Sequence, residues 1–263
     1  MRQLLLALLL LAPLTTTAEE SSTGPLFMKD LVDEGTFFAP WGIGVDWFTM
    51  EQDYSIKSLK FDLPGVGEID PSLVDVSNEV QHYDLQLDVW VTPFLNVFGL
   101  VGRLNNKTQV DLGNVTIPGL PFPLGTLPVN SKGTVYGLGA NLIYGTENWF
   151  AALNGTWTNT NLGGDFDSKV KSLTFQPRLG LIRNQWTMWV GGMWLDTQEK
   201  HSGTIDLGVP GLPTIPFEVE LETMNKWNYA VGVGYIFSPK ATISFEYGFG
   251  DRTHTLFNFT YRF

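Results

Sequence analysis

Strict alternation of apolar and polar residues limits what this chain can fold into more than any other feature. Between Tyr83 and Val89 the odd positions are apolar and the even positions polar, and a two-residue period recurs at 136–144, 227–237 and 243–249. Side chains of a β-strand point to opposite faces in turn, whereas an α-helix repeats about every 3.6 residues. The chain is therefore predicted to be all-β.

The composition of the two strand faces indicates which environment lies on each side. Opposite the apolar positions stand mainly Gly, Asn, Thr and Ser, with very little Lys. A soluble β-sandwich would turn its apolar face inward and present charged residues to water. We therefore expect the apolar face to meet lipid and the small polar face to fill an interior. The alternative is a soluble β-sandwich or a lipocalin-like barrel.

Aromatic residues at the ends of the apolar faces favour strands that span a membrane. They occur in pairs about eight to ten residues apart, which is the length of a tilted strand crossing the hydrocarbon. The pairs are Tyr136 with Tyr144, Trp149 with Trp157, and Trp227 with Phe237. The predicted fold is a closed antiparallel up-and-down transmembrane β-barrel.

Short and long connections alternate along the chain, which is typical of outer-membrane barrels. Links such as 145–148 and 238–240 are short, and the long connections are 61–80, 113–131, 161–169 and 207–222. We count about ten strands, with eight or twelve as alternatives, and an even number places both chain ends on the periplasmic side. The expected spans are 40–60, 80–92, 95–112, 132–145, 149–160, 169–182, 186–206, 222–237, 241–250 and 254–263. The spans 95–112 and 186–206 are apolar on both faces, so the pattern does not fix their register or exclude a bulge.

The N-terminal residues divide into two segments before the barrel, which is expected at 39–263. Residues 1–18 combine Arg2, an apolar stretch from Leu4 to Leu14 and small residues before Glu19, and are expected to be a signal peptide. Residues 19–38 are expected to be a periplasmic segment, in which 26–32 could form one short helix. This segment could be an unstructured lead-in, a plug for the barrel mouth or a helix lying on the membrane interface.

The chain ends on FNFTYRF, an alternation that continues to the last residue. Its aromatic positions are Phe257, Phe259, Tyr261 and Phe263. We expect them to face lipid in a closing strand that pairs with the first strand around 41–48 and leaves no free edge. A terminal Phe preceded by alternating aromatics resembles the C-terminal signature of bacterial outer-membrane proteins, without selecting a family. The resemblance implies outer-membrane lipids, lipopolysaccharide and the barrel-assembly machinery as partners.

Composition excludes several classes of function. The chain has no Cys, a formal net charge of -11 and a pI near 4.6. These values argue against a disulfide framework, a thiolate metal site and a nucleic-acid partner. The Gly-x-Gly sequences at 42–44, 137–139 and 232–234 are not followed by a predicted helix, so they do not indicate a nucleotide-binding loop. We expect a monomer with no cofactor and no metal.

Strand parity predicts which charged residues face the lumen. They are Asp46, Asp84, Asp88, Arg178, Glu246 and Arg262. Ten strands enclose little more than their own side chains, so these groups are expected to pair in a filled core. A gap for a small solute is the alternative.

The long connections share a proline-glycine turn. The three turns are Pro64-Gly65, Pro118-Gly119 and Pro210-Gly211. Proline presets the first turn residue and glycine accepts positive φ at the second, so three rigid hairpin tips are the favoured interpretation. The functional alternative is an apolar lid or recognition surface.

A rim site built on His82, Asp84 and His254 is the one enzymatic hypothesis, since a histidine beside a carboxylate can act as a general base. Omptin-like proteases are expected to carry an Asp-x-His pair and lipid A deacylases a His-x-Ser; His82-Tyr83-Asp84 and His201-Ser202 match neither. We therefore expect a non-enzymatic outer-membrane protein that acts through its loops or a narrow lumen, in small-solute passage, surface binding or envelope integrity. The alternative is an outer-membrane protease or lipid A-modifying enzyme.

Overall fold

The computed structural model describes residues 24–32, 38–61, 70–114, 125–164, 167–205 and 214–263. The described residues form eleven antiparallel strands and two short 3-10 turns, η1 (Lys29–Leu31) and η2 (Pro71–Leu73). The strands are β1 (Trp41–Phe61), β2 (Asp75–Thr92), β3 (Leu95–Asp111), β4 (Thr126–Gly145), β5 (Trp149–Gly164), β6 (Asp167–Arg183), β7 (Trp186–Ile205), β8 (Ile215–Thr223), β9 (Trp227–Ser238), β10 (Ala241–Phe249) and β11 (Thr253–Arg262). The expected signal peptide and the three proline-glycine turns lie outside the described residues.

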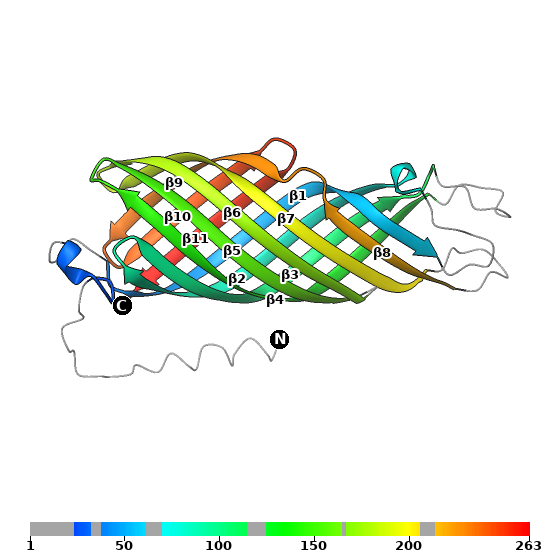
Figure 1. The fold of residues 1–263 in the computed structure, drawn as a ribbon, viewed down its shortest axis with the longest axis horizontal. Helices are drawn as coiled ribbons and strands as arrows, with labels where there is room; N and C mark the ends of the chain where they lie inside the picture. The colour runs from blue at the N-terminus through cyan, green and yellow to red at the C-terminus, as the bar shows by residue number, and fades with distance from the viewer. Residues whose placement is uncertain (1–23, 33–37, 62–69, 115–124, 165–166, 206–213) are drawn as a thin grey trace.

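Pairing between the first and last strands closes the sheet into a barrel (Figure 1). β1 pairs with both β2 and β11, and Val45 lies opposite Phe259. The ring contains ten strands, β1 to β7 and β9 to β11. The predicted closed antiparallel barrel and its closing strand are therefore confirmed. We call the end that holds Trp41 and Phe263 the terminal end, and the opposite end the loop end.

The eleventh strand is β8, which lies almost entirely in the predicted connection 207–222, whereas the predicted span 222–237 corresponds to β9. β9 pairs with residues 186–194 of β7, and β8 continues along the same edge of β7 at 198–205. The hairpin of β10 and β11 turns at 249–253 and does not reach the loop end. The part of β1 from Tyr54 onward therefore lacks β11 as a neighbour and pairs with β8 instead. The barrel thus has a ten-stranded membrane section and an eight-stranded loop-end section made of β1 to β8.

The side chain of Arg252 lies where the ten-stranded and the eight-stranded sections of the barrel meet. Its guanidinium donates hydrogen bonds to the Lys226 carbonyl at 2.6 Å, the Met193 carbonyl at 3.4 Å and Gln52 Oε1 at 3.3 Å. These three groups belong to the β8–β9 junction, to β7 and to β1. Burial lowers the pKa of the Arg252 guanidinium to about 10.

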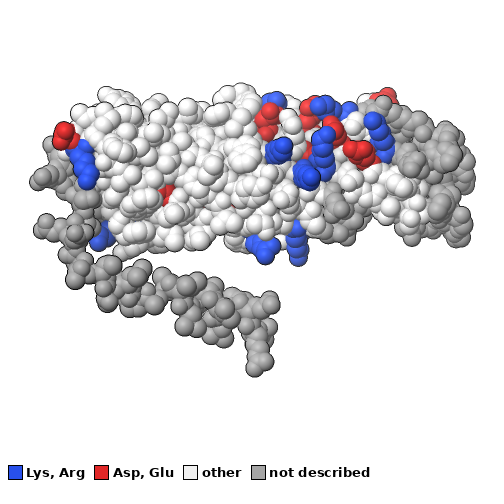
Figure 2. Space-filling model, turned by 60° about the horizontal axis from the view of Figure 1, so that its bottom comes forward, with Lys and Arg blue, Asp and Glu red and all other residues white. Residues whose placement is uncertain are grey.

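The outer surface shows why the ten-stranded part is the membrane section. Its outward side chains are large, apolar and exposed, among them Val45, Leu85, Leu138, Leu179, Val190 and Phe245. On the face drawn in Figure 2, a broad band with almost no charged residue separates the terminal end from the loop end, where Lys, Arg, Asp and Glu gather. The apolar band meets lipid, and the charged section stands in water.

Several residues expected in long loops are strand residues instead. Residues 75–80, 126–131 and 215–222 extend the barrel at the loop end, and β5 and β6 occupy most of 161–169. The alternation inverts there: Val80, Val129 and Leu162 point inward and are buried, whereas Glu79 and Lys107 point outward and form an ion pair at 3.2 Å. These strands were expected to be loops because their outer face meets water and carries no lipid-facing apolar residues.

The two strands of ambiguous register carry large apolar side chains on both faces. In β3 the even positions Phe98 and Leu104 are buried inside, while Val101 is exposed outside. In β7 the inward positions include Trp189 and Met193. The described ladder between β3 and β4 has no register shift. The lumen is thus filled in part by bulky apolar groups, which masked the alternation.

The segment before the barrel closes against the terminal end. Leu26 and Phe27 donate backbone hydrogen bonds to the carbonyls of Trp90 and Val91, both at 2.9 Å, and Pro25 is fully buried. The helix considered over 26–32 is reduced to η1, because these backbone groups are used by the end of β2. No helix among the described residues is long and apolar enough to cross a bilayer.

Candidate functional site in the barrel lumen

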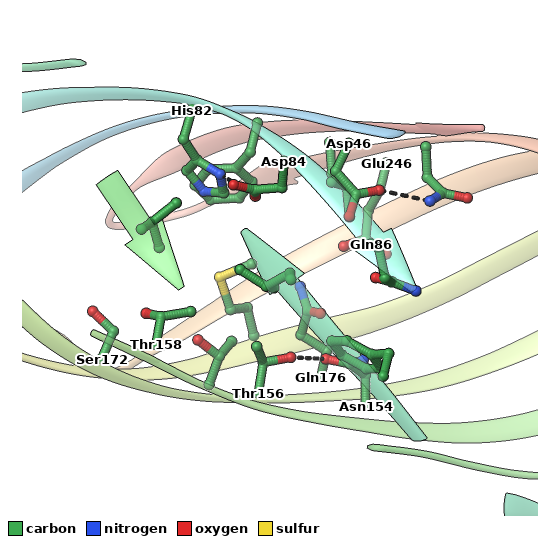
Figure 3. A pocket seen from close by; sticks show the side chains of 18 of the residues that line it. Asp46, His82, Asp84, Gln86, Asn154, Thr156, Thr158, Ser172, Gln176 and Glu246 are labelled. Atoms are coloured by element: carbon green, nitrogen blue, oxygen red, sulfur yellow. Dashed lines mark hydrogen bonds and ion pairs between the residues drawn. The ribbon is translucent and has the colours of Figure 1, made fainter. Parts of the chain in front are cut away.

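The lumen encloses a cavity of about 420 Å³ between two different walls. One wall, from β1 and β2, carries Asp46, His82, Asp84 and Gln86, as Figure 3 shows. The facing wall, from β5 and β6, carries neutral hydrogen-bonding groups: Asn154, Thr156, Thr158, Ser172 and Gln176. We call these the acidic wall and the neutral wall. All six charged residues predicted to face the lumen line this cavity.

Arg178 and Glu246 form an ion pair inside the membrane section. Arg178 Nε lies 2.7 Å from Glu246 Oε2, and the indole N–H of Trp189 donates to the same oxygen at 2.6 Å. His254 Nε2 lies 3.5 Å from the other oxygen of Glu246. With one guanidinium and several donors, the charge of Glu246 is compensated within the protein.

Arg262 and Asp88 form a second ion pair near the terminal end. Arg262 Nη2 lies 2.8 Å from Asp88 Oδ1, which also accepts a hydrogen bond from Asn96 at 2.6 Å. The guanidinium carbon lies 5.7 Å from the ring centroid of Trp90 and 5.9 Å from that of Phe38. We call Phe38, Trp90, Asp88 and Arg262 the terminal closure, because they fill the barrel mouth beside the buried Pro25.

Asp46 and Asp84 differ from Asp88 and Glu246 because no arginine among the described residues contacts either of them. They are direct cross-strand partners on β1 and β2. Asp84 Oδ2 lies 2.5 Å from His82 Nδ1, and Asp46 Oδ1 accepts a hydrogen bond from Asn258 at 2.6 Å. The charged groups that act on Asp46 are Asp84, His82 and Asp88.

The residues of the hypothetical rim site lie deep in the barrel and in two places. His82 contacts Asp84, but His254 is fully buried beside Glu246, and the ring of Phe48 lies between the two histidines at 4.7 Å and 5.9 Å. The expected rim position is wrong, because β1 and β2 continue beyond this level into the loop-end section.

A chain of buried polar side chains that sequence reasoning missed crosses the loop-end section. Tyr54 donates a hydrogen bond to Glu199 Oε1 at 2.5 Å, and His201 Nε2 lies 2.9 Å from Glu199 Oε2. On its other side, His201 Nδ1 lies 2.5 Å from Ser168 Oγ. Burial and the neighbouring carboxylate of Glu199 raise the pKa of Tyr54 well above its usual range.

One signal in the sequence could have indicated this chain. Glu199 and His201 are two residues apart and so share one strand face. Ser202 follows His201 directly in the chain, but adjacent strand residues point to opposite faces, and Ser202 is exposed. Ser168 is instead the cross-strand partner of His201.

Ser168, His201 and Glu199 include the residue types of a hydrolytic triad, but their surroundings favour a structural role. Ser168 lines neither the lumen cavity nor the small apolar cavity that His201 borders, among the described residues. β6, which carries Ser168, pairs with β5 on one edge and with β7 on the other. Its backbone N–H groups are used in these hydrogen bonds, so none is offered to a developing oxyanion. We interpret the chain as a buried cross-brace.

An apolar cluster closes the lumen at the loop end. Its buried members are Tyr54, Leu59, Val74, Val76, Leu112, Ile215 and Leu221. Partly buried Ile56, Val110, Leu127, Phe217 and Val219 pack against them and leave a cavity of about 40 Å³. The lumen cavity therefore lies between the terminal closure and this cluster.

Comparisons with known proteins identify no family for this chain. No family model matches the sequence, and no curated protein matches it. The structure is similar to the transport unit of the autotransporter AIDA-I from Escherichia coli, at 10% identity and a TM-score of 0.42, over 89% of this chain and 93% of that one. It is also similar to the outer membrane protease OmpT from Escherichia coli, at 12% identity and a TM-score of 0.41, over 88% of this chain and 99% of that one. A further similar structure is that of a FadL homologue from Pseudomonas aeruginosa, at 11% identity and a TM-score of 0.31, over 85% of this chain and 90% of that one.

The apolar outer band of the closed barrel decides the location. The chain is a β-barrel of the bacterial outer membrane. Within the part of this barrel that the structure describes, no three His, Asp or Glu side chains are arranged to hold a metal ion.

Proposed function

We propose that this outer-membrane barrel binds a small hydrogen-bonding solute in its lumen and passes it across the membrane without forming a permanently open pore. The observation that carries the proposal is the cavity of about 420 Å³ between the acidic and neutral walls. A volume of this size matches the sites that hold small organic molecules.

The closures at both ends support binding with gated passage over free diffusion. A solute would have to displace the terminal closure on one side and the apolar cluster on the other. Packed side chains hold two discrete arrangements more readily than a continuous opening. The proposed activity is therefore saturable and needs no catalytic residue.

Uptake into proteoliposomes tests the proposal. The refolded full chain, with its fold verified by gel mobility before and after boiling, should admit glycerol and arabinose with saturable kinetics. Its conductance in planar bilayers should stay near the baseline. Folded barrels that admit neither probe, or that show a steady large conductance, would overturn the proposal.

Two neighbouring alanines on β5 provide a matched control. Ala152 lines the cavity, whereas Ala151 points to the lipid side together with its partner Leu179. Ala152→Trp should fill the cavity and abolish uptake, and Ala151→Trp should leave uptake unchanged. Equal uptake by the two variants would mean that the solute does not pass this cavity.

A further inference from the structure

We infer that the outer face of β3 to β6 binds the phosphate groups of lipopolysaccharide in the outer leaflet of the membrane. This inference concerns the lipid side of the barrel and is independent of the lumen and its proposed passage function. The surface consists of four exposed cations towards the loop end, which we call the basic patch. They are Arg103 on β3, Lys132 on β4, and Lys169 and Lys171 on β6.

The first argument is that acids neutralise the neighbouring cations but not the basic patch. Three other outward cations near this level form ion pairs: Lys107 with Glu79 at 3.2 Å, Lys226 with Asp196 at 2.9 Å, and Lys200 with Glu220. Among the described residues, none of the four patch cations forms such a pair, and Arg103 donates a hydrogen bond only to the hydroxyl of Thr134, at 3.1 Å. The positive charge of the patch is therefore left for a group from outside the chain.

The cross-strand neighbours of the patch lysines carry no negative charge. They are Asn105 and Gly163 for Lys132, Asn161 and Lys200 for Lys169, and Asn159 and Gln198 for Lys171. The chain has a formal net charge of -11, so acids are abundant, yet none is a cross-strand partner of these lysines. Like charges gathered on one face repel each other, and a bound anion removes that cost.

The second argument is the level of the patch in the membrane. The turns at the terminal end, such as 93–94 and 184–185, are short, and short turns of such barrels face the periplasm, so the loop end faces outward from the cell. Lys132 lies four residues beyond Tyr136, and Lys171 four residues beyond Phe175, and both aromatic side chains are exposed to lipid. Four residues of a tilted strand rise about 10 Å along the membrane normal. The lysines thus stand at the headgroup level, at the end of the uncharged band where charged residues begin in Figure 2.

The chemistry of the surface fits a phosphorylated saccharide lipid. Lysine and arginine are the side chains that bind phosphate oxygens. Between the lysine-bearing strands, β5 presents the exposed amide of Asn161 and the exposed Gly163, so a sugar can approach the sheet and bind the amide. Towards the membrane, the rings of Tyr136 and Trp157 pack edge to face at 6.4 Å and offer apolar contact to acyl chains. Lipopolysaccharide carries phosphates, sugar and acyl chains in one molecule.

Calorimetric titration of the refolded full chain with lipopolysaccharide, in a nonionic detergent, tests the inference. A patch variant carries three substitutions: Lys132→Gln, Lys169→Gln and Lys171→Gln. It should bind lipopolysaccharide at least about tenfold more weakly than the natural chain, because each cation near an anionic lipid surface contributes to affinity. Binding to the natural chain should also weaken as the salt concentration rises.

A matched control removes the same three charges from exposed positions at the terminal end, through Lys29→Gln, Arg183→Gln and Lys240→Gln. This control should bind lipopolysaccharide as the natural chain does, and so should a variant that replaces the three patch lysines with arginine. Gel mobility before and after boiling verifies that each variant is folded.

Four results would overturn the assignment. They are unchanged binding by the folded patch variant, an equal loss in the terminal-end control, binding of dephosphorylated lipopolysaccharide as tight as that of the natural lipid, and binding of polyglutamate as tight as that of lipopolysaccharide. The last result would mean that the patch attracts any polyanion, including an acidic peptide. A loss confined to the patch variant and to the dephosphorylated lipid supports a lipopolysaccharide site on β3 to β6.

Discussion

Tyr54 on β1 donates a hydrogen bond to Glu199 on β7 across the lumen, although the two residues are 145 positions apart in the chain. β8 lies between their strands in the loop-end section, so the bond spans the interior and not a neighbouring ladder. Both side chains are buried, and Glu199 also contacts His201. This contact braces the level at which ten strands become eight.

Removing the phenol should weaken the barrel at that level. Tyr54→Phe leaves one buried oxygen of Glu199 without its donor, which costs about 1–3 kcal/mol. We expect a lower temperature for the loss of the folded band in gel mobility. Tyr83→Phe alters an outward tyrosine of the membrane section, which is 50% exposed, and should leave that temperature unchanged. Equal stability of the two variants would show that the contact does not brace the barrel.

The same tyrosine predicts a dependence of stability on alkaline pH. The pKa of Tyr54 is raised in the folded chain from an ordinary value of 10.0, so the folded state favours the protonated phenol. Its contribution to stability is complete below pH 10.0 and declines as pH rises toward the folded pKa. The stability advantage of the natural chain over Tyr54→Phe should therefore be constant between neutral pH and pH 10.0 and shrink above it. An advantage that grows at alkaline pH would contradict the assignment.

Loosening the terminal closure should convert gated passage into conductance. Arg262→Ala removes the ion pair with Asp88 and the contacts with the rings of Phe38 and Trp90. We expect stepwise currents in planar bilayers where the natural chain shows almost none. Arg183→Ala, which alters an exposed residue at the end of β6, serves as the control and should stay silent. Silence of a folded Arg262→Ala barrel would show that the closure lies elsewhere.

The alternation of side chains let the sequence predict the barrel, nearly all of its strands and the inward direction of six charged residues. These properties are local, because the two faces of a strand differ at every step of the chain. The terminal aromatics likewise predicted the closing strand, since Phe259 and Tyr261 must meet lipid and find a partner edge.

The tertiary structure alone decided which inward residues meet. Arg178 and Glu246 are 68 positions apart, and their contact depends on strand tilt and on the closing register. The β10–β11 hairpin is short, so the loop-end part of β1 pairs with another strand. From this follow the inverted pattern of the loop-end section, the division of β8 from β9 and the pairing of Ser168 with His201. No local period encodes where a distant hairpin ends, so these features emerge only when the ring is closed.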